Sequence, residues 1–449
     1  MTTVIEAIAH WCATQPRSGE AERAAARDAI ADTIACLYAG RADETTTAVT
    51  AAFGGHAGEA QRSVRWVGPG RTAPSLAALA NGTAAHALDF DDNFTPGMSH
   101  ASAVIVPALL AVADWVGASG ERFVDAYLLA LQAQDFVGSG VRPSHYTAGW
   151  HGTSTVGSIG TAIGTAYLLG LDEAGMARAL SLGTSMASGG KGQFGSPVKP
   201  FHAGMASRNA VEAALLAAEG LTGRLDILER DQGFLELFGG PTPPGYDIDA
   251  IANTATNVIL AAGLAPKAHP CCGSTHKIVD AIIDLMNEEK IDPDTVASVN
   301  GHVGPANYRN LPYTNPQDEM EARFSMQYCA ALAFRQGILK LSDFTPGVVR
   351  QKAGDPLMSR IGMTHYSAAE EAASGKQPHV LTVTLSDGRS FTRERDFARG
   401  MIEDPFTDAQ KRAKFMDCCD GLANAAGLYG QLMALDAARD LAFLDPVFN

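Results

Sequence analysis

The sequence predicts a mainly α-helical protein, a large all-helical bundle domain into which a smaller α+β domain is inserted. Three observations predict it: Ala-rich segments of helical periodicity fill the first 265 residues, strand-like alternation appears only after Pro266, and helical segments return near the C-terminal end. We therefore expect a helical domain made of residues 1–265 and 399–449, and an α+β domain made of residues 266–398.

The N-terminal part of the chain has the pattern of packed helices. In residues 20–39, Ile30, Ile34, Leu37 and Tyr38 fall on one face of a 3.6-residue repeat. Small residues cover most faces of the segment GSIGTAIGTAYLLG, which is typical of a helix at the centre of a bundle. The segment RSVRWV alternates but is too short to make a sheet. Further helices are predicted over 73–89, 101–117, 120–137, 153–169, 172–187 and 200–219.

The pattern changes after Pro266. Residues 274–289 and 319–336 predict helices, whereas 296–303 and 379–385 alternate and predict strands. The sequence SDGRSFTRERD then predicts a hairpin that turns at Asp387-Gly388. Ala- and Leu-rich helices follow over 408–441, which returns the chain to the helical domain.

Composition limits the possible partners. The chain of 449 residues has a formal net charge of −15, and a phosphate backbone requires a basic surface, so we expect no nucleic acid as a partner. Only 18% of the residues are charged. So few charges on a large chain indicate that part of the surface is covered by another subunit. We expect a homodimer whose interface is built from the Ala-rich helices.

Location is predicted from the N-terminus, the apolar segments and the cysteines. The segment MTTVIEAIAHWCATQPR has no basic start and no unbroken apolar core, so it does not resemble a signal peptide. The longest apolar stretch, 101–116, is interrupted and too short to cross a bilayer. The seven cysteines are odd in number and form no CxxC pair, which favours reduced thiols. We expect a cytoplasmic protein that binds no membrane.

Four segments concentrate polar side chains in apolar surroundings, and each also has a structural interpretation as a cap, a turn or a solvated lysine. Lys199 immediately precedes Pro200 near a helix N-terminus, an electropositive place that favours the neutral, basic form of a lysine. No metal is expected, because the adjacent Cys271 and Cys272 cannot easily both bind one tetrahedral ion. The segments are HALDFDDNFTPGMSH (86–100), SHYTAGWHGTS (144–154), SPVKPFHAGMASRNA (196–210) and APKAHPCCGSTHK (265–277).

The chain resembles the MmgE/PrpD family over essentially its whole length. The resemblance is carried by four motifs in this order: HALDFDD, the loop that ends at His100, KPFHAGMASRNA and KxxPCC. The resemblance implies a homodimer, a helical domain with an α+β lid, a small di- or tricarboxylate substrate, no metal and no organic cofactor. The family's decarboxylases have a His where this chain has Cys272, which argues against decarboxylation. The implied pocket residues are Asp89, Asn93, His100, His151, Lys199 and Lys267, to which we add Arg208 and Cys272 as substrate-binding candidates.

The reactions of the family share one step, removal of a proton from a carbon next to a carboxylate. That step needs a positioned base and groups that stabilise an enediolate, and Lys199, Lys267, His100 and His151 are of the right types. Asp89 is a further catalytic candidate. An epimerase needs two groups on opposite faces of one carbon, for which we predict Tyr146 and Lys199. The predicted function is epimerisation of an amino-linked dicarboxylate such as iminodisuccinate. The alternatives are a lyase that dehydrates 2-methylcitrate or decarboxylates cis-aconitate, and a relative that binds carboxylates without catalysis.

Overall fold

The computed structural model describes residues 2–15, 18–54, 63–367, 369–370 and 377–448. It is mainly helical, as predicted, and its chain forms two compact units. Unit 1 comprises residues 1–193, 197–266 and 407–449, and unit 2 comprises 194–196 and 267–406. Among the described residues, we find no helix with the length and apolarity that a bilayer crossing requires.

Unit 1 is a helical bundle around α8, whose residues from Gly152 to Ala166 are all buried. Helix α8 packs against α5, α6, α9 and α10. A Cβ atom at Gly160 would lie 2.5 Å from the backbone nitrogen of Gln134 in α6, so glycine is needed for this close approach. The N-terminal helices are α1 (Val4–Thr14), α2 (Glu20–Gly40), α3 (Glu44–Phe53), α4 (Pro74–His86), α5 (Ala101–Val116) and α6 (Gly120–Ser139). They are followed by α7 (Ser144–Thr147), α8 (Gly152–Leu168), α9 (Glu173–Met186), α10 (Val198–Ala218), α11 (Phe234–Phe238), α12 (Ile248–Ala252) and α13 (Val258–Ala261).

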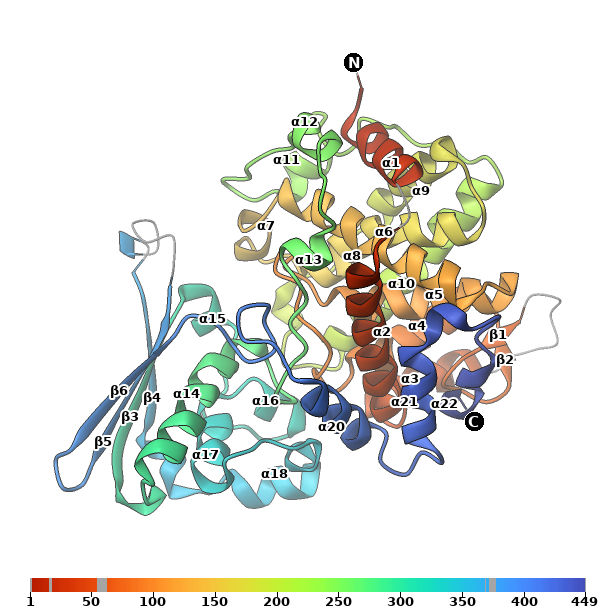
Figure 1. Cartoon of the computed structure of the whole chain (residues 1–449). Helices are drawn as coiled ribbons and strands as arrows, with labels where there is room; N and C mark the ends of the chain where they lie inside the picture. The colour runs from red at the N-terminus through yellow and green to blue at the C-terminus, as the bar shows by residue number, and fades with distance from the viewer. Residues whose placement is uncertain (1, 16–17, 55–62, 368, 371–376, 449) are drawn as a thin grey trace. The chain divides into compact units, whose positions relative to one another are not determined.

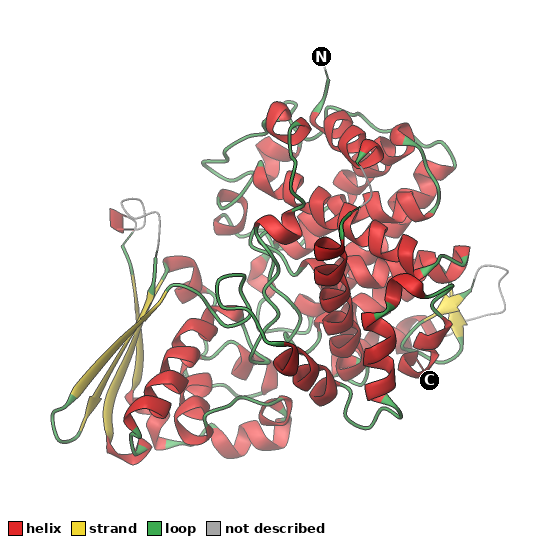
Figure 2. Cartoon of the chain, viewed as in Figure 1, coloured by secondary structure: helices red, strands yellow, loops and turns green. Residues whose placement is uncertain are grey.

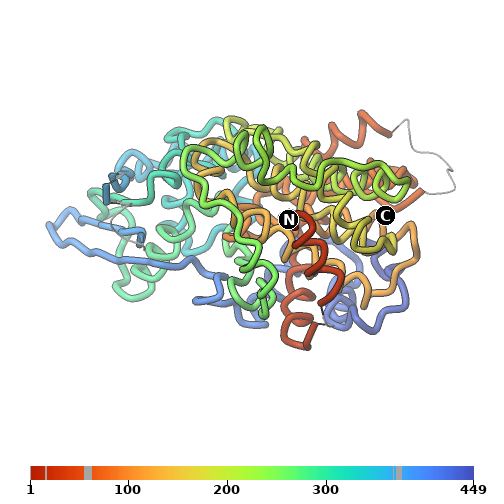
Figure 3. The backbone as a smooth tube through the Cα atoms, turned by 90° about the horizontal axis from the view of Figure 1, so that it is seen from above, coloured from red at the N-terminus to blue at the C-terminus, as the bar shows by residue number. Residues whose placement is uncertain are grey.

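The C-terminal segment completes unit 1. It forms α20 (Asp408–Cys418), α21 (Ala425–Met433) and α22 (Asp445–Phe448), and both α20 and α21 pack against α2 (Figures 1 and 3). Lys414 of α20 is buried and lies 2.8 Å from the Asp32 carboxylate of α2. Because a buried ammonium needs a counter-charge, this ion pair fixes the end of the chain to the bundle.

Unit 1 also contains a small sheet that differs from the prediction. The segment RSVRWV contains β1 (Val64–Arg65). This strand pairs with β2 (Arg71–Thr72), which follows the segment, in an antiparallel ribbon. Arg62 lies outside the described residues. The ribbon is anchored by Trp66, which is buried.

Unit 2 is built on a four-stranded sheet of order β4-β3-β5-β6, the larger of the two yellow regions in Figure 2. Strands β3 (Val296–Val303) and β5 (His379–Leu385) match the predicted segments, and β5 turns through Asp387-Gly388 into β6 (Ser390–Arg395). The sequence analysis missed β4 (Ile361–His365), which pairs parallel with β3. Helices α14 (Gly273–Glu289) and α17 (Met326–Gln336) pack against each other, α14 against β5 and β6, and α17 against β4 (Figure 1). The short helices are α15 (Pro305–Arg309), α16 (Glu319–Arg323) and α18 (Pro346–Lys352).

Two features of unit 2 differ from the sequence expectations. The helix predicted over 319–336 is divided into α16 and α17, because the Ser325 hydroxyl accepts a hydrogen bond from the Tyr328 N–H and starts a new helix. The unit extends to Phe406 rather than 398. The Arg399 N–H donates to the Asp280 carboxylate at 2.9 Å, which holds this segment against α14. A lid role for this unit remains a prediction.

Candidate active site

Lys199, on the first turn of α10, is the centre of a buried polar cluster in unit 1. Its Nζ atom lies 2.8 Å from Asp89 Oδ1 and 2.9 Å from His86 Nε2. Lys199 is 2% exposed, Asp89 3% and His86 1%. Both contacts suit an ammonium that donates to two acceptors, so Lys199 carries its proton in this arrangement. The role of Lys199 as a base during the reaction remains a prediction.

Asp89 reaches Lys199 through an unusual backbone conformation. Helix α4 ends at His86, and Asp89 follows with φ of 51°, in the left-handed region that is uncommon for residues other than glycine. Backbone strain of this kind persists where the surrounding structure enforces it, often at functional sites. Here it directs the Asp89 carboxylate toward Lys199.

His86 joins Lys199 to a second carboxylate. Its Nδ1 atom lies 2.9 Å from both oxygens of Asp91, which is fully buried. Since Nε2 accepts a hydrogen bond from Lys199, the imidazole proton is on Nδ1 and is donated to Asp91. Burial lowers the pKa of His86, and the Lys199 charge adds to this effect while Asp91 opposes it. His86 is therefore neutral at physiological pH.

His100 is the most exposed member of the cluster. It precedes α5, and its Nδ1–H donates to the Asp92 carbonyl at 2.8 Å, which leaves Nε2 as the basic nitrogen. The same Nδ1 atom is 3.4 Å from Asp91 Oδ2, and the His100 ring centroid is 4.4 Å from that of His86. The His100 side chain is 14% exposed.

His151 approaches from the loop before α8. Its ring centroid is 6.0 Å from that of His86, and its Nδ1 is 3.2 Å from Nδ1 of His202 on α10. Burial lowers the pKa of His151 well below its ordinary value and that of His202 to about 4. Both rings are thus neutral and share one hydrogen bond, in which one Nδ1 donates and the other accepts. We call Lys199, Asp89, His86, Asp91, His100 and His151 the Lys199 cluster.

Part of the cluster has the donor atoms of a divalent-cation site. His86, Asp89, Asp91 and His100 each place one ligand atom within 4.8 Å of the others. The Lys199 ammonium, however, already donates to Asp89 and His86. The chain thus supplies its own cation to this set of carboxylates, and the geometry fits a lysine acid better than a metal.

Tyr146 lies beside Lys191, whose Nζ is 3.4 Å from the Tyr146 ring centroid. Backbone hydrogen bonds join the segment of Lys191 to the segment of Tyr146 and His151. The Lys191 N–H donates to the Gly149 carbonyl, and the His151 N–H donates to the Gly189 carbonyl. The Lys191 ammonium also donates to the Tyr146 carbonyl at 3.3 Å. An opposed Tyr146–Lys199 pair remains a prediction.

Arg208 does not join the Lys199 cluster. It lies nine residues after Lys199 on α10, about half a turn out of phase, so it faces the other side of the helix. There it contacts Asn209 and Glu212. Asn93 is close to the cluster in sequence, and its backbone pairs with Ala265 at 2.8 and 2.9 Å.

Lys267 and Cys272 belong to unit 2. Lys267 is among the largest fully buried side chains of the protein. Cys272 precedes α14, and its N–H donates to the Arg323 carbonyl at 2.9 Å. Nearby, His269 Nε2 lies 3.0 Å from Asp280 Oδ1. A role of Lys267 and Cys272 in binding remains a prediction.

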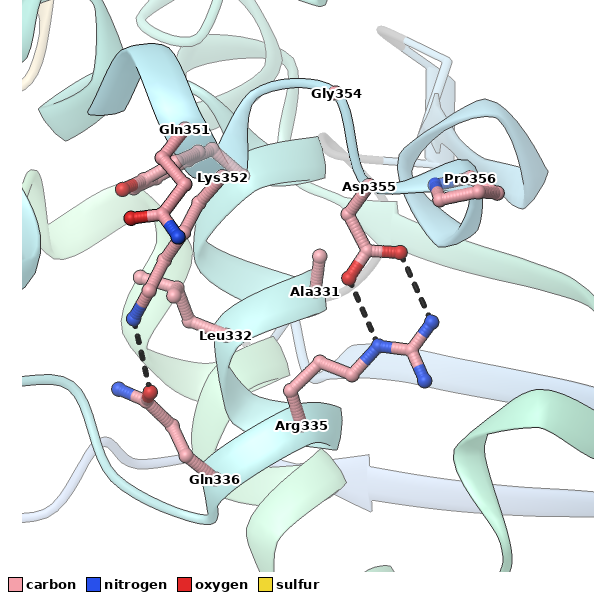
Figure 4. Close-up of a pocket in the computed structure, with 10 residues that line it drawn as sticks. Ala331, Leu332, Arg335, Gln336, Gln351, Lys352, Gly354, Asp355 and Pro356 are labelled. Atoms are coloured by element: carbon pink, nitrogen blue, oxygen red, sulfur yellow. Dashed lines mark hydrogen bonds and ion pairs between the residues drawn. The ribbon is translucent and has the colours of Figure 1, made fainter. Parts of the chain in front are cut away.

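Unit 2 also has a cavity of about 430 Å³ between α17 and the segment after α18 (Figure 4). Arg335 and Lys352 line it, but both cations face carboxylates. Arg335 forms two hydrogen bonds with Asp355 at 2.8 and 2.9 Å, and Lys352 lies 2.7 Å from Asp343. The positive charge here is neutralised within the chain, so this cavity is a poor site for a carboxylate substrate.

The structure adds residues that the sequence analysis did not choose as site residues. His86 and Asp91 were visible in HALDFDD, but the hydrogen bond between His86 and Lys199 depends on how α4 and α10 pack. His202 lies three residues after Lys199, a helical spacing that places both on one face. Lys191 lies in the Gly-rich stretch after α9, and no local signal distinguishes it.

Comparison with known proteins gives consistent results over both units. Residues 6–247 match the MmgE/PrpD N-terminal domain, and residues 269–427 match the MmgE/PrpD C-terminal domain. The cis-aconitate decarboxylase of Homo sapiens is 27% identical over 355 residues, which cover 77% of this chain and 72% of that protein. The cis-aconitate decarboxylase of Mus musculus is 26% identical over 362 residues, with coverage of 77% and 72%. That of Aspergillus terreus (strain NIH 2624 / FGSC A1156) is 25% identical over 430 residues, with coverage of 88% and 85%.

Proposed function

Because the chain belongs to the MmgE/PrpD family, we propose that it is a lyase that acts on a small di- or tricarboxylate. The relatives named above are decarboxylases, which favours the lyase over the epimerase that the sequence analysis put first. A lyase of this class passes through a carbanion next to a carboxylate, formed by loss of carbon dioxide or of a proton. The protein must then stabilise that carbanion and move a proton.

The observation that carries this proposal is the buried Lys199 ammonium, held by Asp89 and His86. In a decarboxylation, carbon dioxide leaves with the loss of a C–C bond, and the electron pair that remains on carbon must take up a proton. An ammonium with two fixed acceptors is an oriented proton donor, and its charge also stabilises the carbanion before the transfer. The neutral His151 can donate its Nε2–H to a substrate carboxylate when its Nδ1 accepts from His202, and Nε2 of His100 can accept a proton or a hydrogen bond from the substrate.

Substrate carboxylates require more positive charge than Lys199 provides, because Asp89 and Asp91 lie beside it. We propose that Lys191 binds a substrate carboxylate. Lys267 is proposed as a further substrate-binding residue. Asn93 and Cys272 are proposed as neutral contacts that set the shape of the substrate.

Epimerisation of an iminodisuccinate-like dicarboxylate is the second candidate. Cys272 favours it, since the sequence analysis placed this thiol where the family's decarboxylases have a histidine. In that reaction Lys199 and Tyr146 would exchange a proton with the two faces of one carbon, and no bond of the carbon skeleton would break.

A substrate panel distinguishes these activities. The purified protein is given cis-aconitate, citrate, 2-methylcitrate and iminodisuccinate in separate reactions. We expect release of carbon dioxide from cis-aconitate or a new C=C absorbance from citrate or 2-methylcitrate. Loss of optical activity from iminodisuccinate, with no reaction of the other three, would contradict the lyase proposal and support the epimerase.

A further inference from the structure

We propose that Lys199, His86 and Asp91 form a proton relay, in which His86 takes the ammonium proton of Lys199 and returns it during the reaction. The inference rests on the proposed role of Lys199 in proton transfer at carbon. In the relay the Nζ–H bond of Lys199 breaks and an Nε2–H bond forms on His86. Lys199 becomes an amine, and His86 becomes an imidazolium whose Nδ1–H remains bonded to Asp91. His86 and Asp91 are positioning residues, since Lys199 is the group that meets the substrate.

The distances permit direct transfer along this line. Lys199 Nζ and His86 Nε2 are 2.9 Å apart, and His86 Nδ1 is 2.9 Å from both Asp91 oxygens. Asp91 keeps the His86 proton on Nδ1 and therefore keeps Nε2 directed at Lys199 as an acceptor. In a serine protease triad, a carboxylate likewise orients a histidine that takes a proton from a nucleophile.

The charges are matched at both ends of the relay. When the proton is on Lys199, the positive charge lies 2.8 Å from the Asp89 carboxylate. When it is on His86, the positive charge lies 2.9 Å from the Asp91 carboxylate. Since a buried charge is costly unless paired, the two carboxylates provide a counter-charge for the proton in either position. Lys199 can therefore act as an acid when it holds the proton, and as a base when the proton is on His86.

The relay is also shielded from water. The side chains of His86 and Asp91 are 0% exposed and that of Lys199 is 3% exposed. Direct exchange of the Lys199 proton with bulk water is consequently slow, and a buried partner that can hold the proton has a function. His100, which is 14% exposed and 3.4 Å from Asp91, is the point where the relay comes closest to solvent.

The pH dependence of the relay follows from the groups that face His86. Protonation of His86 by solvent would place two cations side by side and remove the acceptor of Lys199. Because Asp91 raises the pKa of His86 against the effect of burial, removing its charge must lower that pKa further. The titratable groups around His86 include Lys199 and His202 on α10, Asp89 and Asp91 after α4, His100 before α5 and His151 before α8.

Two variants test the relay in the intact protein. The amide oxygen of His86→Gln can still accept from Lys199 but cannot take its proton, and Asp91→Asn preserves shape without charge. We expect kcat to fall about 10²- to 10⁴-fold in His86→Gln with little change in KM. The acid limb of the kcat/KM profile should vanish in His86→Gln and move to lower pH in Asp91→Asn. A wild-type rate, or a slower rate with an unchanged pH profile in both variants, would overturn the relay.

A measurement without substrate separates the relay from the proposed function. In protein labelled with [15N]histidine, the imidazole signal lost in His86→Gln should show a protonated Nδ1, and its Nε2 shift should change in Lys199→Met. An Nε2 shift that is the same with and without Lys199 would overturn the relay even if the enzyme is a lyase. The matched control is His379→Gln, another buried histidine, on β5 of unit 2, which should leave the rate and the pH profile unchanged.

Discussion

At the scale of single residues, the sequence identified Lys199 and Asp89 but not the chemistry of their contact. Helix phase places Arg208 across the helix from Lys199, because the two residues are nine positions apart. His86 could not be chosen in the same way, since its role depends on a hydrogen bond between α4 and α10 and on a tautomer fixed by Asp91. A residue type in a motif predicts a candidate, and only tertiary contacts determine whether it is an acid or a base.

Replacing Lys199 by methionine tests the ion pair and the reaction together. Lys199→Met leaves the buried Asp89 carboxylate without this cation, which we expect to lower the free energy of unfolding by about 3 kcal/mol and kcat by at least about 10²-fold. The double variant Lys199→Met/Asp89→Asn should recover most of the stability in urea denaturation and none of the activity. Recovery of activity in the double variant would remove Lys199 from the proposed chemistry.

At the scale of elements, the helices of unit 1 were predictable because their small and apolar residues repeat with helical periodicity. Strand β4 was not, because IGMTH has one buried residue and pairs in parallel with β3 from far away in the chain. Close contact between α4 and α10, which carry His86 and Lys199, depends on glycines on both helices. A Cβ at Gly204 would lie 2.3 Å from the Leu79 carbonyl oxygen, and one at Gly82 would lie 2.5 Å from Ser207 Oγ.

Two glycine-to-alanine substitutions test whether stability and activity depend on the close contact between α4 and α10. Gly204→Ala should lower the free energy of unfolding by about 1–3 kcal/mol, because backbone of α4 must move, and should also reduce kcat. Gly430→Ala on α21 meets no atom within 4 Å and should raise stability by about 0.5–1 kcal/mol with kcat unchanged. Equal effects of the two substitutions in urea denaturation would mean that the α4–α10 contact is not tight.

Helix α7 gives a pH-dependent test of stability. His145 Nδ1 lies 2.7 Å from the carbonyl of Phe238, the last residue of α11, and Nε2 lies 2.7 Å from Thr155 Oγ1 of α8. Burial lowers the pKa of His145 to about 4, below the unfolded value near 6.5. The unfolded chain therefore binds this proton first, and stability that is complete above pH 6.5 is lost as the pH falls toward 4.

The His145→Gln variant isolates that titration. From pH 7 to pH 5 we expect wild-type stability to decrease more steeply than that of the variant, by about 1–2 kcal/mol. Urea denaturation at several pH values measures both slopes. Identical slopes would show that His145 takes up its proton equally well in the folded and unfolded states.

At the scale of the whole molecule, two compact units carry the residues that the family resemblance implied. The helical class and the inserted α+β segment were readable from periodicity, and the unit boundary at Phe406 was not, because contacts of Arg395 and Arg399 with α14 set it. The net charge of −15 predicts that nucleic acid is not a partner, but it does not argue against an anionic substrate. Lys191 lies against the Tyr146 ring, and Lys199 and Lys267 are buried.

The predicted homodimer is a property of the whole molecule that solution mass can test. Leu216, Leu221 and Leu237 of unit 1 are exposed in the single chain, at 39%, 48% and 60%. Apolar side chains of this kind on a chain with few charges favour an interface. Light scattering should give about twice the chain mass of 47.0 kDa, at salt concentrations high enough to screen the negative charge. A monomer mass across salt concentrations would contradict the dimer.

We propose that Lys199 transfers a proton while the protein breaks a bond to a carbon of a small polycarboxylate. NMR of cis-aconitate and citrate reactions in heavy water tests it most directly, with wild type and Lys199→Met side by side. We predict that the wild-type reaction yields a product that has lost carbon dioxide or water, at a rate at least about 10²-fold above that of Lys199→Met. Substrates that lose neither carbon dioxide nor water, and show only deuterium exchange or inversion at carbon, would contradict this role of Lys199.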